Sequence, residues 1–96
     1  MTAIVVARVR VTDHEKYEAY KPLSKKAIEE YGGRYLVRGS DPIALEGNSA
    51  GMRYVVIEFD SVESAMNFYD SPGYRRARAA REGAAETTIE VLQGVQ

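Results

Sequence analysis

The chain contains no cysteine and a single histidine, His14, among its 96 residues. The absence of cysteine excludes a disulfide framework, a thiolate nucleophile and a zinc-finger site. One histidine also argues against a metal centre built from several imidazole ligands. The sequence contains neither a glycine-rich phosphate loop nor a nucleophile triad. We therefore expect no metal and no tightly bound cofactor.

An excess of charge of one sign is also missing. The net charge of −1 at pH 7 leaves no electrostatic footprint for nucleic acid or for an anionic membrane. No apolar run approaches the roughly 20 residues of a membrane span, and the sequence begins without a signal-peptide pattern. These features predict a cytoplasmic protein with no nucleic-acid partner and no membrane partner. A length of 96 residues predicts one domain, over residues 1–96.

Turn residues and apolar periodicity predict four strands, over residues 2–11, 34–38, 53–59 and 87–92. A helix is predicted between the first two strands. It begins at Thr12 or Asp13, where Thr12-x-x-Glu15 has the spacing of a capping box, and it ends at Gly32-Gly33. Pro22 lies in the middle of this segment and predicts a kink or a short break.

A second helical region follows the third strand and is interrupted near residue 71. Ser71 is a favourable N-cap, and Pro72 occupies the first helical position, where its missing N–H costs nothing. The helix before this break is predicted to begin after Asp60 or Ser61, and the helix after it to run to about residue 81. Residues 43–46 are predicted to be an extended piece of the loop between the second and third strands.

The resulting order of elements is βαββαβ. Right-handed crossovers applied to this order predict a ferredoxin-like α+β fold, in which a four-stranded antiparallel sheet has the strand order 4-1-3-2 and both helical regions lie on one face. The other face would expose apolar side chains of the first and third strands, including Ile4, Val6 and Val56. An apolar face of this kind is unusual on a soluble monomer. We therefore predict a homodimer that covers it.

The uncovered face is also predicted to carry charges. Alternation along the strands places Arg8, Glu58 and Glu90 together, so that Arg8 lies between the two carboxylates. Arg34 and Arg38 complete the same polar end. Two interpretations stay open. One is a cross-strand ion-pair ladder at the dimer interface, and the other is the polar end of an apolar cavity that orients a small polar or acidic ligand.

RNA-recognition modules share the βαββαβ topology and form a remote alternative. They stack bases on aromatic residues of their first and third strands. Here the first strand has no aromatic residue, and the third offers Tyr54 followed by the acidic Glu58 on the relevant face. The basic run Arg75-Arg76-x-Arg78-x-x-Arg81 is typical of a solvated helix face or of pairing with the nearby Glu82 and Glu86, so an RNA-binding role is not favoured.

Several motifs occur together along the chain. They lie in residues 9–17, 31–39, 45–47, 53–61 and 68–74. In combination they resemble the domain of unknown function 1330 family, in the dimeric α/β-barrel superfamily. Asn48-Ser49 stand where many relatives have an Asp-Trp pair, and Gly73 stands where they tend to have an acidic residue. The resemblance implies two ferredoxin-like sheets paired face to face in a dimeric α/β barrel, and it implies no settled activity.

The resemblance also sets the range of functions to weigh, because that superfamily includes cofactor-free monooxygenases, small-ring isomerases and haem enzymes. His14 is the one candidate for a proximal haem ligand or an imidazole base, and a solvated residue at a helix start is its alternative. Tyr69 is interpreted as a core or pocket-wall aromatic, with a phenol at a cavity mouth as the functional alternative.

We therefore expect a small organic molecule to bind between the sheet and the helices, and we leave catalysis without a cofactor open. The candidate ligand contacts are Arg8, Arg38, Glu58, Tyr69 and His14. The competing hypothesis is a non-catalytic structural or stress-associated dimer with an ion-paired interface.

Overall fold

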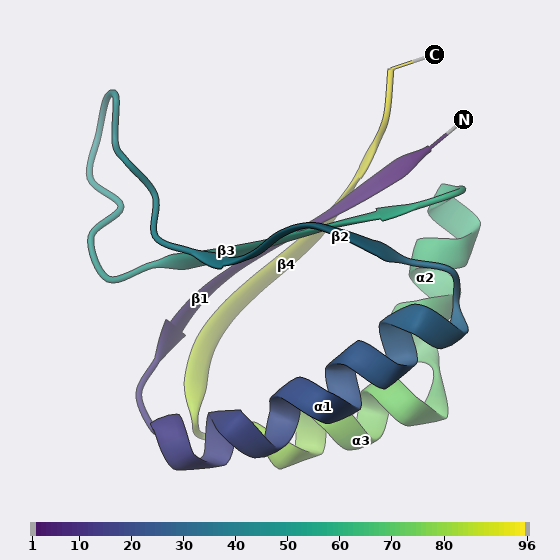
Figure 1. Cartoon of the computed structure of the whole chain (residues 1–96), viewed down its shortest axis with the longest axis horizontal. Helices are drawn as coiled ribbons and strands as arrows, with labels where there is room; N and C mark the ends of the chain where they lie inside the picture. The colour runs from purple at the N-terminus through teal and green to yellow at the C-terminus, as the bar shows by residue number, and fades with distance from the viewer. Residues whose placement is uncertain (1, 96) are drawn as a thin grey trace.

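Four strands form one antiparallel sheet, and three helices cover one of its faces (Figure 1). The computed structural model describes residues 2–95. In chain order the elements are β1 (Ala3–Val11), α1 (His14–Glu30), β2 (Arg34–Ser40), β3 (Arg53–Phe59), α2 (Val62–Asp70), α3 (Pro72–Ala80) and β4 (Ala85–Gln93). Within the described residues, no helix has the length and the apolar character that crossing a membrane requires.

The strand order is β2-β3-β1-β4, which confirms the order predicted from right-handed crossovers. β1 lies inside the sheet and pairs antiparallel with β3 on one side and with β4 on the other. β4 begins earlier than the sequence pattern predicts, because Ala85 and Glu86 already pair with Val11 and Arg10. The βαββαβ, ferredoxin-like α+β prediction is therefore correct.

The start of α1 confirms one of the two caps that the sequence predicts. Asp13 is the N-cap, and its Oδ1 accepts a hydrogen bond from the backbone N–H of Lys16 at 3.1 Å. Because the helix begins one residue later than a Thr12 cap requires, the predicted capping box between Thr12 and Glu15 is not used. Of the kink or short break predicted at Pro22, the break does not occur, since α1 is continuous across that residue.

The break predicted near residue 71 separates α2 from α3. The Ser71 hydroxyl accepts a hydrogen bond from the backbone N–H of Tyr74 at 3.2 Å and donates one to the carbonyl of Phe68 at 2.7 Å. Pro72 stands at the first turn of α3, where no N–H is needed. Ser71 is only 3% exposed, so one buried hydroxyl ends one helix and begins the next.

The core fills the space between the sheet and the helices. The odd-numbered residues of β1, from Ala3 to Val9, are buried on this side, as the period of two in a strand requires. Phe59, Phe68 and Tyr74 form an aromatic cluster, with ring centroids 5.2 Å apart for the first pair and 4.4 Å apart for the second. These rings join β3, α2 and α3 in one hydrophobic unit.

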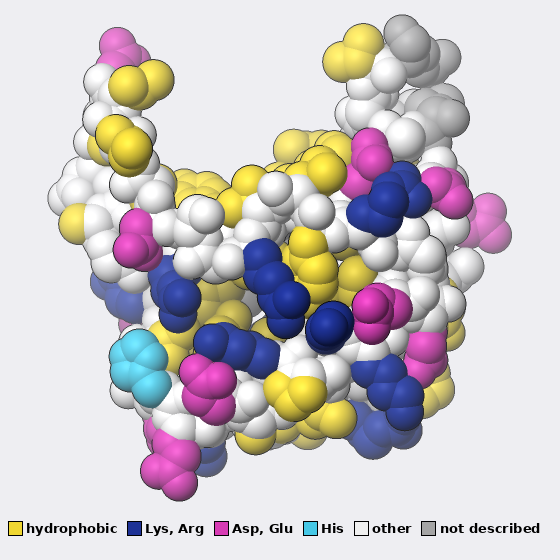
Figure 2. All heavy atoms as spheres, viewed as in Figure 1, with side chains coloured by type: hydrophobic (Ala, Val, Ile, Leu, Met, Phe, Trp, Pro, Cys, Tyr) yellow, Lys and Arg dark blue, Asp and Glu magenta, His cyan; other side chains and the backbone are white. Residues whose placement is uncertain are grey.

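None of the helices of residues 2–95 lies over the other face of the sheet, the outer face (Figure 1). Ile4, Val6 and Val56 lie on this face and are half-buried, and Val6 pairs directly with Val56. A loop over residues 41–52 projects beyond the sheet, and Ile43 and Leu45 on it are 90% and 95% exposed. The loop holds no strand, and bends at residues 45–47 interrupt the extended piece predicted at residues 43–46. Figure 2 shows hydrophobic side chains between this projection and the C-terminal one.

Candidate functional site

A cavity of about 220 Å³ lies between the helix-covered face of the sheet and the helices. All four strands and all three helical segments, with the residue that follows α3, contribute to its lining. Figure 2 shows Lys and Arg side chains gathered around a hollow in the middle of the molecule. The lining residues are Val5, Ala7, Val9, Tyr17, Tyr20, Lys21, Ser24, Tyr35, Arg38, Gly39, Arg53, Val55, Ile57, Phe68, Tyr74, Arg81, Thr87 and Ile89.

The floor of the cavity is apolar and belongs to the sheet. Val5 and Ala7 of β1, Val55 and Ile57 of β3, and Ile89 of β4 all point to the helix side, as their pairing in register requires. Rigid paired strands hold these side chains in place. A floor of this kind binds the apolar body of a small molecule, because it removes that surface from water.

Four tyrosines form the cavity wall, with Tyr17 and Tyr20 on α1, Tyr35 on β2 and Tyr74 on α3. The hydroxyl oxygens of Tyr20 and Tyr74 lie 2.7 Å apart and share a hydrogen bond. Burial raises the pKa of Tyr17 to about 12, and the neighbouring Tyr20 adds to the shift. Burial also raises the pKa of Tyr74 and of Tyr35. The hydroxyls of Tyr17, Tyr35 and Tyr74 therefore stay protonated at neutral pH and act as hydrogen-bond donors.

Three guanidinium groups converge on the cavity from separate parts of the chain: Arg38 on β2, Arg53 on β3 and Arg81 directly after α3. The guanidinium carbon of Arg38 lies 4.7 Å from the centroid of the Tyr35 ring, and that of Arg81 lies 5.2 Å from the centroid of the Tyr20 ring. Such stacking fixes the plane of a guanidinium and favours its charge.

These three cations lack acidic partners. Among residues 2–95, no carboxylate lies within ion-pair distance of Arg38, Arg53 or Arg81. The Nη1 of Arg81 lies 3.5 Å from the Thr87 hydroxyl, while its Nε is buried without a hydrogen-bond partner. Lys21, the fourth cation of the lining, is paired with a carboxylate of α1 at 3.0 Å. The cavity therefore carries positive charge that the described chain does not neutralise.

The chemistry available to the cavity follows from these groups. The described residues of its lining include no carboxylate and no imidazole. Guanidinium groups and neutral phenols donate hydrogen bonds but do not take up a proton near pH 7. The arrangement can hold an anion and can stabilise negative charge that forms on a ligand oxygen. An ordinary general base is not part of it.

Arg38 is the one sequence-predicted candidate that lines this cavity, and it does so from the face opposite to the one predicted. The prediction placed it beside Arg34 on the outer face by strict alternation. β2 shifts register between Tyr35 and Val37 and again between Arg38 and Ser40. Arg34 pairs with an outer-face residue, whereas Arg38 pairs with Val55 of the cavity floor. The irregularity reverses the face of the strand.

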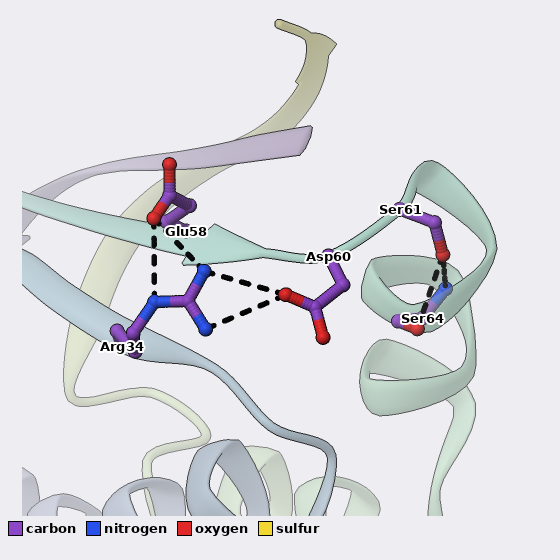
Figure 3. A network of polar contacts seen from close by, with 5 residues as sticks. All are labelled: Arg34, Glu58, Asp60, Ser61 and Ser64. Carbon is purple, nitrogen blue, oxygen red and sulfur yellow. Dashed lines mark hydrogen bonds and ion pairs between the residues drawn. The ribbon is translucent and has the colours of Figure 1, made fainter. Parts of the chain in front are cut away.

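Arg8 and Glu58 lie on the outer face and do not line the cavity. The predicted arrangement, with Arg8 between Glu58 and Glu90, is wrong in part. The Nη2 of Arg8 lies 3.5 Å from the Glu90 carboxylate, but Glu58 is bound by Arg34 at 2.9 Å. Asp60 lies 3.4 Å from the same Arg34 nitrogen (Figure 3). The outer face thus carries two separate cross-strand ion-pair groups within the described chain.

Tyr69 and His14 lie away from the main cavity. Tyr69 is 37% exposed and lines a second cavity of about 200 Å³ between α2 and β4. Its hydroxyl accepts a hydrogen bond from Arg78 Nη1 at 3.1 Å, and that guanidinium stacks on its ring with its central carbon 4.2 Å from the centroid. His14 is exposed at the first turn of α1. Within residues 2–95, no group of acidic, histidine or cysteine residues is arranged to hold a metal ion.

Sequence reasoning missed Arg53 and Arg81 as site residues. Arg81 belongs to the basic run that was predicted to be a solvated helix face, yet it is half-buried against the cavity while Arg75 and Arg76 are exposed. The spacing within α3 carried the signal, because a residue four positions after the buried Ala77 lies on the same helix face. Arg53 is two residues before Val55 in β3, and residues two apart in a strand lie on the same face. The sequence therefore also indicated that Arg53 faces the helices.

A sheet of order β2-β3-β1-β4 with helices on one face is the ferredoxin-like α+β fold. The chain belongs to the family described as a domain of unknown function, DUF1330, whose model matches residues 2–95. This match confirms the resemblance found in the sequence. A search of the curated proteins finds no match to the chain.

Solved structures share the fold at low sequence identity. A protein of unknown function from Rhodopseudomonas palustris is 22% identical with a TM-score of 0.70, over 98% of this chain and 83% of that one. SnoaB, a cofactor-independent oxygenase from Streptomyces nogalater, is 11% identical with a TM-score of 0.69, over 99% and 94% of the two chains. A protein of Caulobacter crescentus proposed to be an antibiotic biosynthesis monooxygenase is 18% identical with a TM-score of 0.70, over 99% and 91%.

Proposed function

We propose that this chain binds a small organic molecule in the cavity between the sheet and the helices, and that it does so as a homodimer. The observation that carries the proposal is the cavity itself, in which an apolar floor faces a wall of tyrosine and arginine donors. Small-molecule sites have this anatomy, with few polar groups converging over an apolar surface. The volume of about 220 Å³ lies below the ~300–1,000 Å³ of sites for drug-sized ligands, so the ligand is a compact one.

The homodimer is supported by the outer face. Its apolar residues, Ile4, Val6 and Val56, have no helix over them, and the projecting loop beside them carries the exposed Ile43 and Leu45. A second copy that packs its own outer face against this one would cover both surfaces. The ion pairs of the outer face would then lie in the interface. In the competing hypothesis of a non-catalytic structural dimer, these ion pairs only stabilise the interface and no ligand binds.

A catalytic role without a bound cofactor is the second form of the proposal. SnoaB is a cofactor-independent oxygenase, and a fold shared at this distance supports only that such chemistry is compatible with the fold. The specific observation in this chain is the set of donors at the cavity, which would stabilise a negative charge on the ligand. Since the described lining supplies no base, the reacting molecule would have to enter in its anionic form or lose its proton to water.

A thermal-unfolding screen of compact organic molecules tests the proposed binding. Ala7→Leu is expected to abolish stabilisation by every hit, because Ala7 is a floor residue and the larger side chain would fill the cavity. Ala19→Leu on the exposed surface of α1 makes the same chemical change and should leave each hit active. A hit that stabilises both variants equally binds elsewhere, and hits of that kind alone would remove the proposal.

A further inference from the structure

We propose that the cavity selects small organic anions, with a planar carboxylate as the simplest form, over neutral molecules of the same shape. The inference rests on the proposed binding function and adds the charge and the class of the ligand. It is drawn from three features of the cavity: arginines without a carboxylate partner among the described residues, a hydroxyl hydrogen without an acceptor there, and an apolar floor.

The first feature is the charge that the protein leaves uncompensated. Arg38, Arg53 and Arg81 line one cavity with no carboxylate in ion-pair distance among the described residues. The positive charges of Arg81 and Arg53 both act to lower the pKa of the Tyr17 hydroxyl. Two of the guanidinium groups therefore lie near the same part of the cavity. Like charges held close together repel, and an anion between them replaces that repulsion by attraction.

The arginines are also shaped for a planar oxygen group. Arg38 stacks on Tyr35 and Arg81 on Tyr20, at 4.7 Å and 5.2 Å from guanidinium carbon to ring centroid. The Nε of Arg81 is buried and has no hydrogen-bond partner. A stacked guanidinium presents its N–H fork in a fixed plane, which matches the two oxygens of a carboxylate.

The second feature is the pair of tyrosine hydroxyls. Tyr20 and Tyr74 share one hydrogen bond of 2.7 Å between their oxygens, and that bond uses one of the two hydroxyl hydrogens. The nearby Arg81 cannot accept the other hydrogen, because a guanidinium has no acceptor. Arg81 donates side-chain hydrogen bonds to both hydroxyls, and no acceptor for the remaining hydrogen is found among the described residues. An anionic oxygen in the cavity would accept the remaining hydrogen.

The third feature separates an organic anion from inorganic phosphate. The cavity floor is built from aliphatic side chains of three strands, among them Val5, Ile57 and Ile89. Inorganic phosphate would gain nothing from this surface and would lose part of its hydration above it. A carboxylate on an apolar body uses both halves of the cavity, the donors at one side and the floor below.

A paired-probe titration tests the inference on the full chain. Benzoate, phenylacetate and cinnamate, each beside its amide, and inorganic phosphate are titrated into isotope-labelled protein, with backbone and arginine Nε signals as the readout. We expect each acid to bind about tenfold more tightly than its amide, which corresponds to one hydrogen bond to a charged group. Phosphate is expected to bind more weakly than the acids.

Variants with one charge removed assign the preference to the cavity. Arg53→Gln should weaken binding of the acids about tenfold and leave the amides unchanged, and Arg38→Gln on the edge strand provides a second variant of the same design. Arg75→Gln, at an exposed position of α3, removes the same charge and should change affinity by less than about twofold.

The outcomes separate the inference from the function on which it rests. Acids and amides that bind the cavity equally well would overturn the anion selectivity and leave small-molecule binding intact. Phosphate that binds as tightly as the acids would overturn the organic part of the inference. If none of the organic probes binds, both the inference and the proposed function are wrong.

Discussion

The contact between the Tyr20 and Tyr74 hydroxyls, 2.7 Å apart, joins α1 to α3 at the wall of the cavity. Tyr74 is 2% exposed and packs on Phe68, with ring centroids 4.4 Å apart, so its ring belongs to the core while its hydroxyl belongs to the cavity. Tyr20 also carries the stacked guanidinium of Arg81. One pair of residues thus connects the stability of the fold to the geometry of the candidate site.

Removing one member of this pair has a measurable cost. Tyr74→Phe is expected to lower the free energy of unfolding by about 1–2 kcal/mol, because the hydrogen bond between the Tyr20 and Tyr74 hydroxyls is lost in a half-buried place. Urea denaturation measures the change. Tyr31→Phe, which removes a half-buried hydroxyl that has no hydrogen bond within the described chain, should change stability by less than about 0.5 kcal/mol. Equal effects of the two variants would contradict the role of the pair.

The raised pKa values of the cavity phenols make stability depend on pH in the alkaline range. The pKa of Tyr17 rises from 10.0 to about 12 on burial beside Tyr20, and burial raises those of Tyr35 and Tyr74. The unfolded chain loses these protons first. Their contribution is therefore complete below the unfolded pKa of about 10 and is lost as the pH rises through the folded pKa.

The expected result is a flat free energy of unfolding up to about pH 9 and a fall between about pH 10 and pH 12. Denaturation curves across this range measure it. Tyr17→Phe removes one of the titrating phenols, so its stability should fall less steeply over the same interval. A Tyr17→Phe curve parallel to that of the parent would show that Tyr17 does not titrate as described.

At the scale of elements, the break between α2 and α3 fixes where the aromatic wall of the cavity stands. The Ser71 hydroxyl accepts from the Tyr74 N–H and donates to the Phe68 carbonyl. Because both partners carry aromatic rings of the core, the cap also sets the position of those rings. Ser71 is therefore a structural residue, and replacing it should shift the Phe68 and Tyr74 rings that line the cavity.

Ser71→Ala should lower the free energy of unfolding by about 1–2 kcal/mol, since it leaves a buried N–H and a buried carbonyl without their partner. Ser61→Ala removes the equivalent cap of α2, where Ser61 accepts from the Ser64 N–H at 3.0 Å in a half-buried position. We expect the smaller loss there, because water can reach this cap. Thermal unfolding of the two variants gives the comparison, and a larger loss for Ser61→Ala would contradict the account.

The elements that could be predicted from sequence are those fixed by local chemistry. The caps at Ser61 and Ser71 and the strand order follow from short-range signals and from the handedness of crossovers. The face of Arg38 could not be predicted by alternation, because the register of β2 shifts around it. Gly39, with a φ of 75° inside the strand, was the available signal, since a glycine in a strand often marks a bulge.

The cavity was predicted only as a location between sheet and helices. Its cations come from elements far apart in the sequence, such as Arg38 and Arg81, and spacing along a chain gives no distance between such residues. The basic run at residues 75–81 was interpreted wrongly as a whole, because Arg75 and Arg76 face solvent whereas Arg81 lines the cavity. A run of charged residues in the sequence gives the sign of the charge on a helix, but it does not show which parts of the fold each side chain faces.

At the scale of the molecule, the outer face predicts how the chain assembles. Sedimentation at micromolar concentration should give a mass near twice the 10.7 kDa of one chain. Val56→Asp places a charge opposite Val6 on the half-buried outer face, and an unpaired charge in an interface costs several kcal/mol. We expect this variant to dissociate. Ala19→Asp on the exposed side of α1 is the control and should stay dimeric. A stable dimer of Val56→Asp would place the interface elsewhere.

The central claim is that the ligand lies between the sheet and the helices, and a crystal soaked with the tightest-binding molecule of the screen tests it most directly. The account predicts difference density over the floor residues Val5 and Ile57, within reach of Arg53 and Arg81. Density on the outer face beside Arg8, with the cavity unchanged, would contradict it.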